Sequence, residues 1–203
     1  MFRIKMLAAC MMAAMTLAMS LDASSALATE LYSGATTITK NTIYVASLEP
    51  ETTVSLTDTE KDPIKTCTES TIAGDVTNPG GAAATVEAHV DFVSFTGGAN
   101  CNVTVNQNLN GGLVIHHIAG TKDGTLTGSG FHITIHVFGT TCTYGLGAAT
   151  DMGRLTGSTT GEATLDITAV LNRVTGGFLC PSTGYWVGTY WMTIPDPLHV
   201  TAS

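Results

Sequence analysis

Two segments of this chain alternate between apolar and polar residues, the period of a β-strand that buries one face. They read ATVEAHVDFVSFTGGANC (residues 84–101) and ATLDITAVLNRVTGGFLC (residues 163–180). In both, a Thr-Gly-Gly turn signal follows the alternation and a cysteine closes the segment. The alternation predicts that the apolar residues point inward, namely Val86, Ala88, Val90 and Phe92 in the first segment and Leu165, Ile167, Ala169 and Leu171 in the second.

Further strands are predicted where β-branched and aromatic residues gather. The stretches are TIYVASL (42–48), TTVSLT (52–57), NVTVN (102–106), GLVIHHI (112–118), FHITIHV (131–137) and YWVGTYWMTI (185–194). KDGT (122–125) and NGG (110–112) are predicted turns. Many short strands joined by glycine-rich turns indicate an all-β fold, an antiparallel β-sandwich with a β-barrel as the alternative.

The N-terminus has the pattern of a secretory signal peptide. Arg3 and Lys5 supply positive charge, an apolar run covers residues 6–19, and Ala26 and Ala28 form a small-x-small cleavage pattern. Cleavage after residue 28 would leave a single domain, residues 29–203, since no low-complexity linker divides it. An alternative is a lipoprotein box at residues 7–10, which would leave Cys10 lipidated. No later segment reaches the ~18 apolar residues of a membrane helix, so an exported chain without a transmembrane segment is expected.

Charge narrows the possible partners. Removing residues 1–28 from the 8 basic and 16 acidic residues of the chain leaves 6 and 15, a net charge of about −9. Nucleic-acid binding needs a basic surface, so a nucleic-acid partner is excluded. Partners of another kind, a glycan, a lipid or a surface component, stay open.

Four cysteines remain after cleavage, and an even number in an exported chain predicts two disulfides. The two alternating segments align without a gap, and each follows another cysteine, in CTES at Cys67 and in CTYG at Cys142. We therefore predict two related β units, each closed by its own bridge, Cys67–Cys101 and Cys142–Cys180.

Histidines are the first candidates for metal chemistry. His132 and His136 lie four residues apart, but on a strand this spacing spans ~13 Å, too far for one ion. A cross-strand site could join either of them to His116 or to its neighbour His117 only if residues 113–118 and 131–137 pair, and no third ligand is evident. No metal site and no cofactor is therefore predicted.

Aromatic residues gather at YWVGTYW (185–191). On a strand, Trp186 and Tyr190 would point to one face, and Tyr185 and Trp191 to the opposite face. One set is predicted to pack in the core. For the second set, Tyr185 and Trp191, core packing on a strand buried on both faces is favoured, because large aromatics are more often inside than out. A surface for stacking on sugars or a partner is the alternative.

No catalytic residue is assigned. A nucleophile elbow, a phosphate loop, a dinucleotide fingerprint and an HExxH motif are all missing from the sequence. Glu87, His89 and Asp91 share one predicted strand face at steps of ~7 Å, which is compatible with acid–base chemistry in a small hydrolase. A solvated strand face explains the same residues.

The leader, the paired C…C units, the CTYG start and the ending CPSTGYWVGTYWMTIPDPLHV resemble small exported bacterial proteins of unknown function. The chain is also similar, more faintly, to the secreted activator proteins linked to bacterial alkane oxidation, whose role is not carried over. The resemblance implies a β-protein at the cell envelope or outside the cell. The function expected is non-catalytic binding or surface structure, with a carbohydrate- or lipid-binding module and a small acid/base hydrolase as the alternatives.

Overall fold

The computed structural model describes residues 28–81, 85–106, 111–137 and 139–202. The predicted leader up to residue 27, including Cys10, lies outside these residues, as do Ala84 and Asn110. The described residues form strands and turns without a helix, so the all-β prediction is confirmed. Within this part of the chain, no helix has the length and hydropathy needed to cross a membrane.

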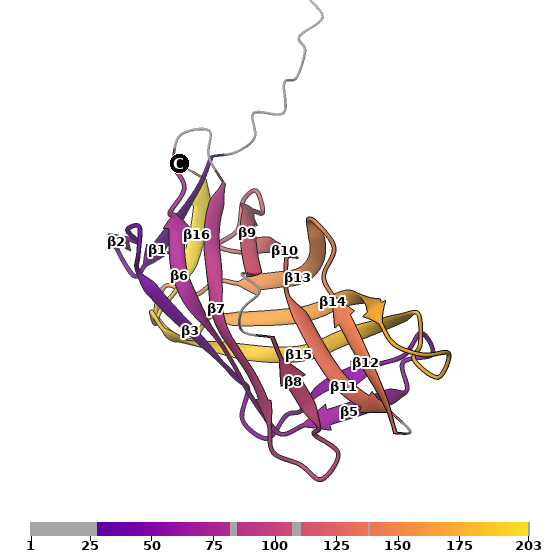
Figure 1. Ribbon diagram of the computed structural model, residues 1–203. Coiled ribbons are helices and arrows are strands. Elements are labelled where there is room, and N and C mark those ends of the chain that lie inside the picture. Colours follow the sequence, from indigo (N-terminus) through magenta and orange to yellow (C-terminus); the bar gives the residue numbers. More distant parts are fainter. Residues whose placement is uncertain (1–27, 82–84, 107–110, 138, 203) are drawn as a thin grey trace, which may run out of the picture.

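Of the two predicted architectures, the barrel is found. Eight antiparallel strands follow one another around it, and β15 closes the ring by pairing with both β14 and β3 (Figure 1). The barrel strands are β3 (Ile43–Leu48), β6 (Glu69–Asn78), β7 (Val86–Thr96), β9 (Gly111–His117), β10 (Gly124–Ser129), β13 (Thr150–Thr156), β14 (Thr164–Thr175) and β15 (Thr183–Ile194).

Side chains fill the barrel. Each strand contributes buried apolar residues, as the alternation predicted for Leu165, Ile167, Ala169 and Leu171. An eight-stranded barrel is just wide enough for side chains to meet at its axis. The void between them measures about 30 Å³ and has an apolar lining. A space of this size does not admit a small-molecule ligand, so binding has to be sought on the outside.

One end of the barrel carries a separate three-stranded sheet. It consists of β1 (Thr29–Ser33), β2 (Thr36–Thr37) and β16 (His199–Ala202), with β1 in the middle. Leu31 and Val200 of this sheet belong to the buried core. The sheet is fastened to β9, because the His117 backbone N–H donates to the Thr29 hydroxyl at 3.1 Å. It therefore closes this end of the barrel with apolar side chains.

His199 is buried in this end sheet and makes stability depend on pH. Its ring stacks on Tyr32 with 5.6 Å between centroids. Burial, helped by the charge of Lys122 and partly opposed by a backbone hydrogen bond at Ser158, lowers the pKa of His199 in the folded state. The unfolded chain then binds more protons, so the free energy of unfolding should fall as the pH drops below about 6.5.

Urea unfolding at pH 8 and pH 5.5 tests this effect. We expect the parent protein to lose more stability between the two pH values than the His199→Asn variant does. His116→Asn is the matched control, because His116 lies exposed on β9. An equal pH dependence in the parent and in His199→Asn would contradict the assignment.

Two hairpins and one short strand lie outside the barrel. They are β4 (Val54–Thr57) with β5 (Pro63–Cys67), β11 (His132–Val137) with β12 (Thr140–Gly145), and β8 (Val103–Val105). The β14–β15 hairpin is long enough to extend beyond the barrel, where β4 pairs with β15 and β12 pairs with β14 (Figure 1). This projecting part, which we call the distal lobe, continues the barrel sheet, with strands added on both sides of the β14–β15 hairpin.

The predicted duplication is visible in the topology. The first half runs β3, the β4–β5 hairpin, then β6, β7 and β9; the second runs β10, the β11–β12 hairpin, then β13, β14 and β15. The two predicted disulfides are present, Cys67–Cys101 and Cys142–Cys180. Each one fastens the second strand of an outer hairpin to the loop that follows a barrel strand. Aligned residues also match, since Val86 and Leu165 are buried and Glu87 and Asp166 are exposed.

The six predicted strands are all present, and some details differ from the prediction. Gly111 and Gly112 begin β9, and Gly124 and Thr125 begin β10, instead of forming turns. The strands β6, β10, β12 and β13 come from threonine- and glycine-rich sequence in which no strand was predicted. Phe92 is 46% exposed, so the prediction that it points inward is wrong.

A β-bulge explains the exposure of Phe92. Gly74 pairs with Val90 and Ala73 pairs with Phe92, which leaves Asp91 without a partner in the ladder. An extra residue reverses the faces of all residues after it. Val93 and Phe95 therefore point into the core in place of Phe92.

Candidate functional site

The histidines considered as metal ligands lie on strands that do not pair with each other. β9, which carries His116, pairs with β7 and β10, whereas β11, which carries His132 and His136, pairs with β8 and β12. The strand pairing that a cross-strand histidine site required is therefore not formed. The His136 Nδ1 atom is instead hydrogen-bonded to the Thr141 hydroxyl at 3.1 Å.

The aromatic cluster on β15 divides between core and surface. Trp186 and Tyr190 are 3% and 0% exposed, and the Trp186 indole N–H donates to the Tyr190 hydroxyl at 3.1 Å. Tyr185 and Trp191 point to the outer face and are half-buried there. Val187, between them, is 38% exposed. This outer face is an amphipathic strip with serine and threonine partners on the neighbouring strands, such as Ser47 opposite Trp191.

On the acidic face of β7, two of the predicted residues are in contact. The Asp91 Oδ1 and His89 Nδ1 atoms lie 2.8 Å apart. Asp75 of β6 lies opposite His89 in the ladder. One ligand atom from each of these three residues lies within 4.8 Å of the other two, a spacing that suits a metal ion. Glu87, the third residue of the predicted hydrolase face, is not part of this group.

A groove of about 430 Å³ lies in the distal lobe, outside the barrel. We call it the distal groove. Half of its lining is polar and half is apolar. The polar residues are Asp58, Asp62, Lys65, Asn100 and His136, and the apolar residues are Pro63, Ile64, Val137, Leu179 and Pro181.

Both halves of the duplication build the distal groove. The first half contributes the β4–β5 hairpin and the loop that contains Asn100; the second contributes the β11–β12 hairpin and the loop that contains Leu179 and Pro181. The disulfides hold these pieces together, because Asn100 precedes Cys101 and because Leu179 and Pro181 flank Cys180. The groove is therefore covalently braced on both sides.

Hydrogen bonds fix the first wall. The Asp58 carboxylate accepts the backbone N–H groups of Glu60 and Asp62 at 2.9 and 3.0 Å, which closes the β4–β5 turn. The Asn100 side-chain amide donates to the Ile64 carbonyl at 3.4 Å. Lys65 donates to the Asn100 side-chain oxygen at 3.5 Å. The Asp58 carboxylate therefore stabilises the β4–β5 turn. The side chains of Asp62, Lys65 and Asn100 offer polar atoms to a ligand.

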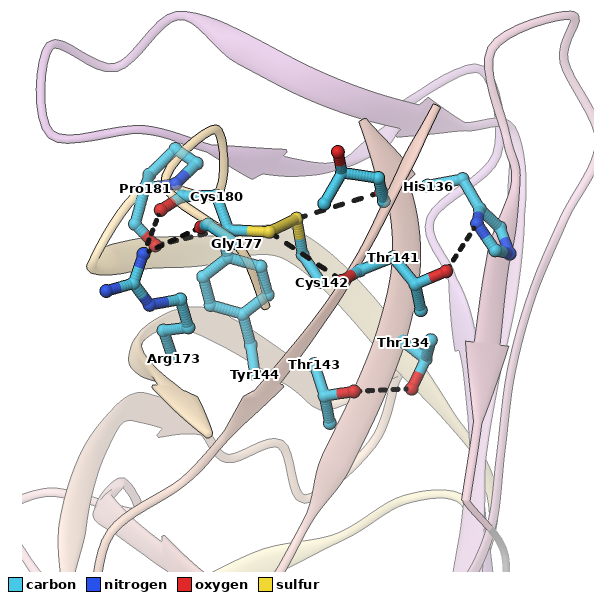
Figure 2. Close-up of a disulfide and its surroundings, with 11 residues drawn as sticks. Thr134, His136, Thr141, Cys142, Thr143, Tyr144, Arg173, Gly177, Cys180 and Pro181 are labelled. Atoms are coloured by element: carbon cyan, nitrogen blue, oxygen red, sulfur yellow. Dashed lines mark hydrogen bonds between the residues drawn. A yellow bond between two sulfur atoms is a disulfide. The ribbon is translucent and has the colours of Figure 1, made fainter. Parts of the chain in front are cut away.

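The second wall is fixed by Arg173 and Tyr144 (Figure 2). The Arg173 guanidinium donates to the carbonyls of Gly177 and Cys180, and the Tyr144 hydroxyl donates to the Pro181 carbonyl at 3.0 Å. Burial raises the pKa of Tyr144, with the charge of Arg173 acting against it, so its hydroxyl stays a neutral donor. The loop between β14 and β15 is held at three of its carbonyls.

This braced loop exposes an aromatic side chain. Phe178 is 94% exposed and its neighbour Leu179 is 42% exposed. The Thr-Gly-Gly turn makes the loop possible, because Gly176 has a φ of 140° that other residues rarely adopt. A phenylalanine this exposed contributes no burial to folding, so its ring is free to contact a binding partner.

The distal groove was not predicted from the sequence, whereas the disulfides that brace it were. Asn100 and Phe178 are adjacent or nearly adjacent to bridged cysteines, and both follow the repeated Thr-Gly-Gly turn. The sequences between turn and cysteine are Ala-Asn and Phe-Leu, the only parts of the two endings that differ. Such a difference within an otherwise repeated ending is the signal that could have drawn attention to them.

The fold defines the class of this protein: a disulfide-braced, closed antiparallel β-barrel with a filled interior and a groove on an outer lobe. Comparison with known protein families, with curated proteins and with solved structures finds no match for this chain. The two disulfides fit a compartment outside the cytoplasm.

Proposed function

We propose that this chain is an exported, non-catalytic binding protein of the bacterial cell envelope or extracellular space, and that its distal groove binds a glycan. The leader and the disulfides support export. The groove of mixed polarity carries the proposal of binding, together with the exposed Phe178, which precedes the lining residue Leu179 in the chain.

The lining of the distal groove favours a sugar over a lipid chain. Five polar side chains line it, and an acyl chain would cover them without offering hydrogen bonds. A pyranose ring has hydroxyl groups for Asp62, Asn100 and His136 and an apolar face for Phe178. The residues of the hydrolase alternative, Glu87 and its neighbours on β7, do not line the groove.

Glycan binding by the purified mature chain tests the proposal. We expect a glycan-array screen to give a ligand, and calorimetry on it to show about tenfold weaker binding for Phe178→Ala, as truncating an aromatic contact residue costs more than ~1 kcal/mol. Asn100→Ala should weaken binding through lost hydrogen bonds.

The control is Phe92→Ala, which removes another exposed phenylalanine far along β7 from the groove lining. Trp191→Ala tests the outer face of β15 as the rival glycan surface. Sedimentation with phospholipid vesicles tests the lipid alternative. Failure of every glycan to bind, or binding that survives Phe178→Ala and Asn100→Ala but is lost in Trp191→Ala, would refute the groove assignment.

A further inference from the structure

The side chains of Asp75, His89 and Asp91 meet on the outer wall of the barrel, away from the residues that line the distal groove. We propose that they form a site for one divalent transition-metal ion, with Zn²⁺ as the best match. This site is independent of glycan binding, because the two share no residue.

Backbone geometry places the three ligands. Asp75 and His89 are direct partners across the β6–β7 ladder, where neighbouring side chains on one face are ~5 Å apart. Asp91 follows His89 by two residues on β7, so both side chains leave the same face of the strand, and they touch at 2.8 Å. Asp75, His89 and Asp91 therefore form a convergent set.

A buried tyrosine, Tyr44, lies beneath the cluster of Asp75, His89 and Asp91. Tyr44 of β3 is 6% exposed, and its hydroxyl donates to the His89 carbonyl at 3.0 Å. Gly74 makes this reach possible, because a Cβ there would lie 1.8 Å from the His89 carbonyl oxygen and 2.9 Å from the Tyr44 hydroxyl. Burial, followed by the charges of Asp91 and Asp75, raises the pKa of Tyr44, which fits both carboxylates lying near its oxygen.

The charges of the cluster are not balanced by the described residues. Among them, Arg154–Asp123 is the ion pair that involves Lys or Arg, so neither Asp75 nor Asp91 has a Lys or Arg partner there. Two carboxylates on one ion-sized site repel each other when both are ionised. A divalent cation between the three residues would neutralise both carboxylates.

The donor set selects among cations. One imidazole nitrogen with two carboxylate oxygens suits Zn²⁺ and its first-row neighbours, whereas Ca²⁺ takes six to eight oxygen ligands. Three protein ligands leave a coordination position for water or for another molecule. Ca²⁺ should therefore bind more weakly than Zn²⁺ at this position.

Calorimetric titration of the chelator-treated mature protein with ZnCl₂ tests the site. We expect one ion per chain and a rise in Tm on binding, with Kd raised at least about tenfold in His89→Asn and in Asp75→Asn. Co²⁺ as a spectroscopic probe should give visible absorption bands that both variants lose. Parallel titration with CaCl₂ should show weaker binding.

Glu87→Gln is the matched control, because it removes a neighbouring carboxylate on the same strand and should leave the Zn²⁺ affinity unchanged. His136→Asn controls for adventitious binding to an isolated histidine. The absence of stoichiometric Zn²⁺ binding, or binding unchanged by His89→Asn, meaning an adventitious ion only, would overturn the proposal. Circular dichroism of each variant separates lost ligands from lost folding.

Discussion

Replacement of Cys142 and Cys180 together by alanine is expected to lower the free energy of unfolding by about 4 kcal/mol. The bridge closes a loop with a sequence separation of 38 residues, and its removal lets the unfolded chain explore many more conformations. Both cysteines are almost completely buried, at 0% and 2% exposure, so packing is lost as well. Guanidinium unfolding without reductant, followed by circular dichroism, measures the effect.

The matched control is the Cys67→Ala, Cys101→Ala double variant. Its bridge spans 34 residues, so chain entropy predicts almost the same loss of stability. The two variants should differ in ligand binding, because the first frees Leu179 and Pro181 and the second frees Asn100. A loss below about 1 kcal/mol in both variants would contradict a stabilising role of the bridges.

Trp186→Ala is expected to lower the free energy of unfolding by about 3–5 kcal/mol, the usual cost of removing a large buried aromatic residue. The indole packs against Phe95, Phe131 and Tyr190, with ring centroids 5.1 to 6.2 Å apart. These rings come from three different parts of the chain and join the barrel to the distal lobe. Equilibrium unfolding in urea measures the change.

The second tryptophan supplies the control for Trp186. Trp191 lies on the same strand with its side chain on the outer face, so Trp191→Ala should cost only about 1 kcal/mol. Each variant keeps one tryptophan, and the emission of Trp186 should be blue-shifted relative to that of Trp191 because only Trp186 is fully buried. Equal losses of stability in the two variants would contradict the placement of the two faces of β15.

The duplication suggests how the distal groove arose within one chain. Each half places an outer hairpin and a braced loop at the same end of the barrel, and the groove lies where the two sets meet. The loops differ in the two residues before the cysteine, so one wall offers Asn100 and the other offers Leu179. A repeated scaffold thereby presents two different chemistries to one ligand.

The sequence by itself determined the strands with strong alternation and the pairing of the cysteines. Period-two patterning is a local property, because successive side chains on any strand point to opposite sides. The repeat identified the bridges, since each Cys-to-Cys unit recurs with the same ending. Alternation also separated Tyr185 and Trp191 from Trp186 and Tyr190, but which of the two sets faces outward was decided by the tertiary structure.

Only the tertiary structure decided between a sandwich and a closed barrel, because the closing contact joins β3 to β15 and local patterning does not encode which distant strands pair. The same holds for the two candidate sites. The distal groove brings together residues 58 and 181 from opposite halves of the chain, and the pairing of β6 with β7 places Asp75 opposite His89. In the sequence, residues 89–95 show only a doubled apolar pair, Phe92 and Val93. Pairing with β6 decides that Asp91 is the extra residue of the bulge and that Asp75 joins His89 and Asp91.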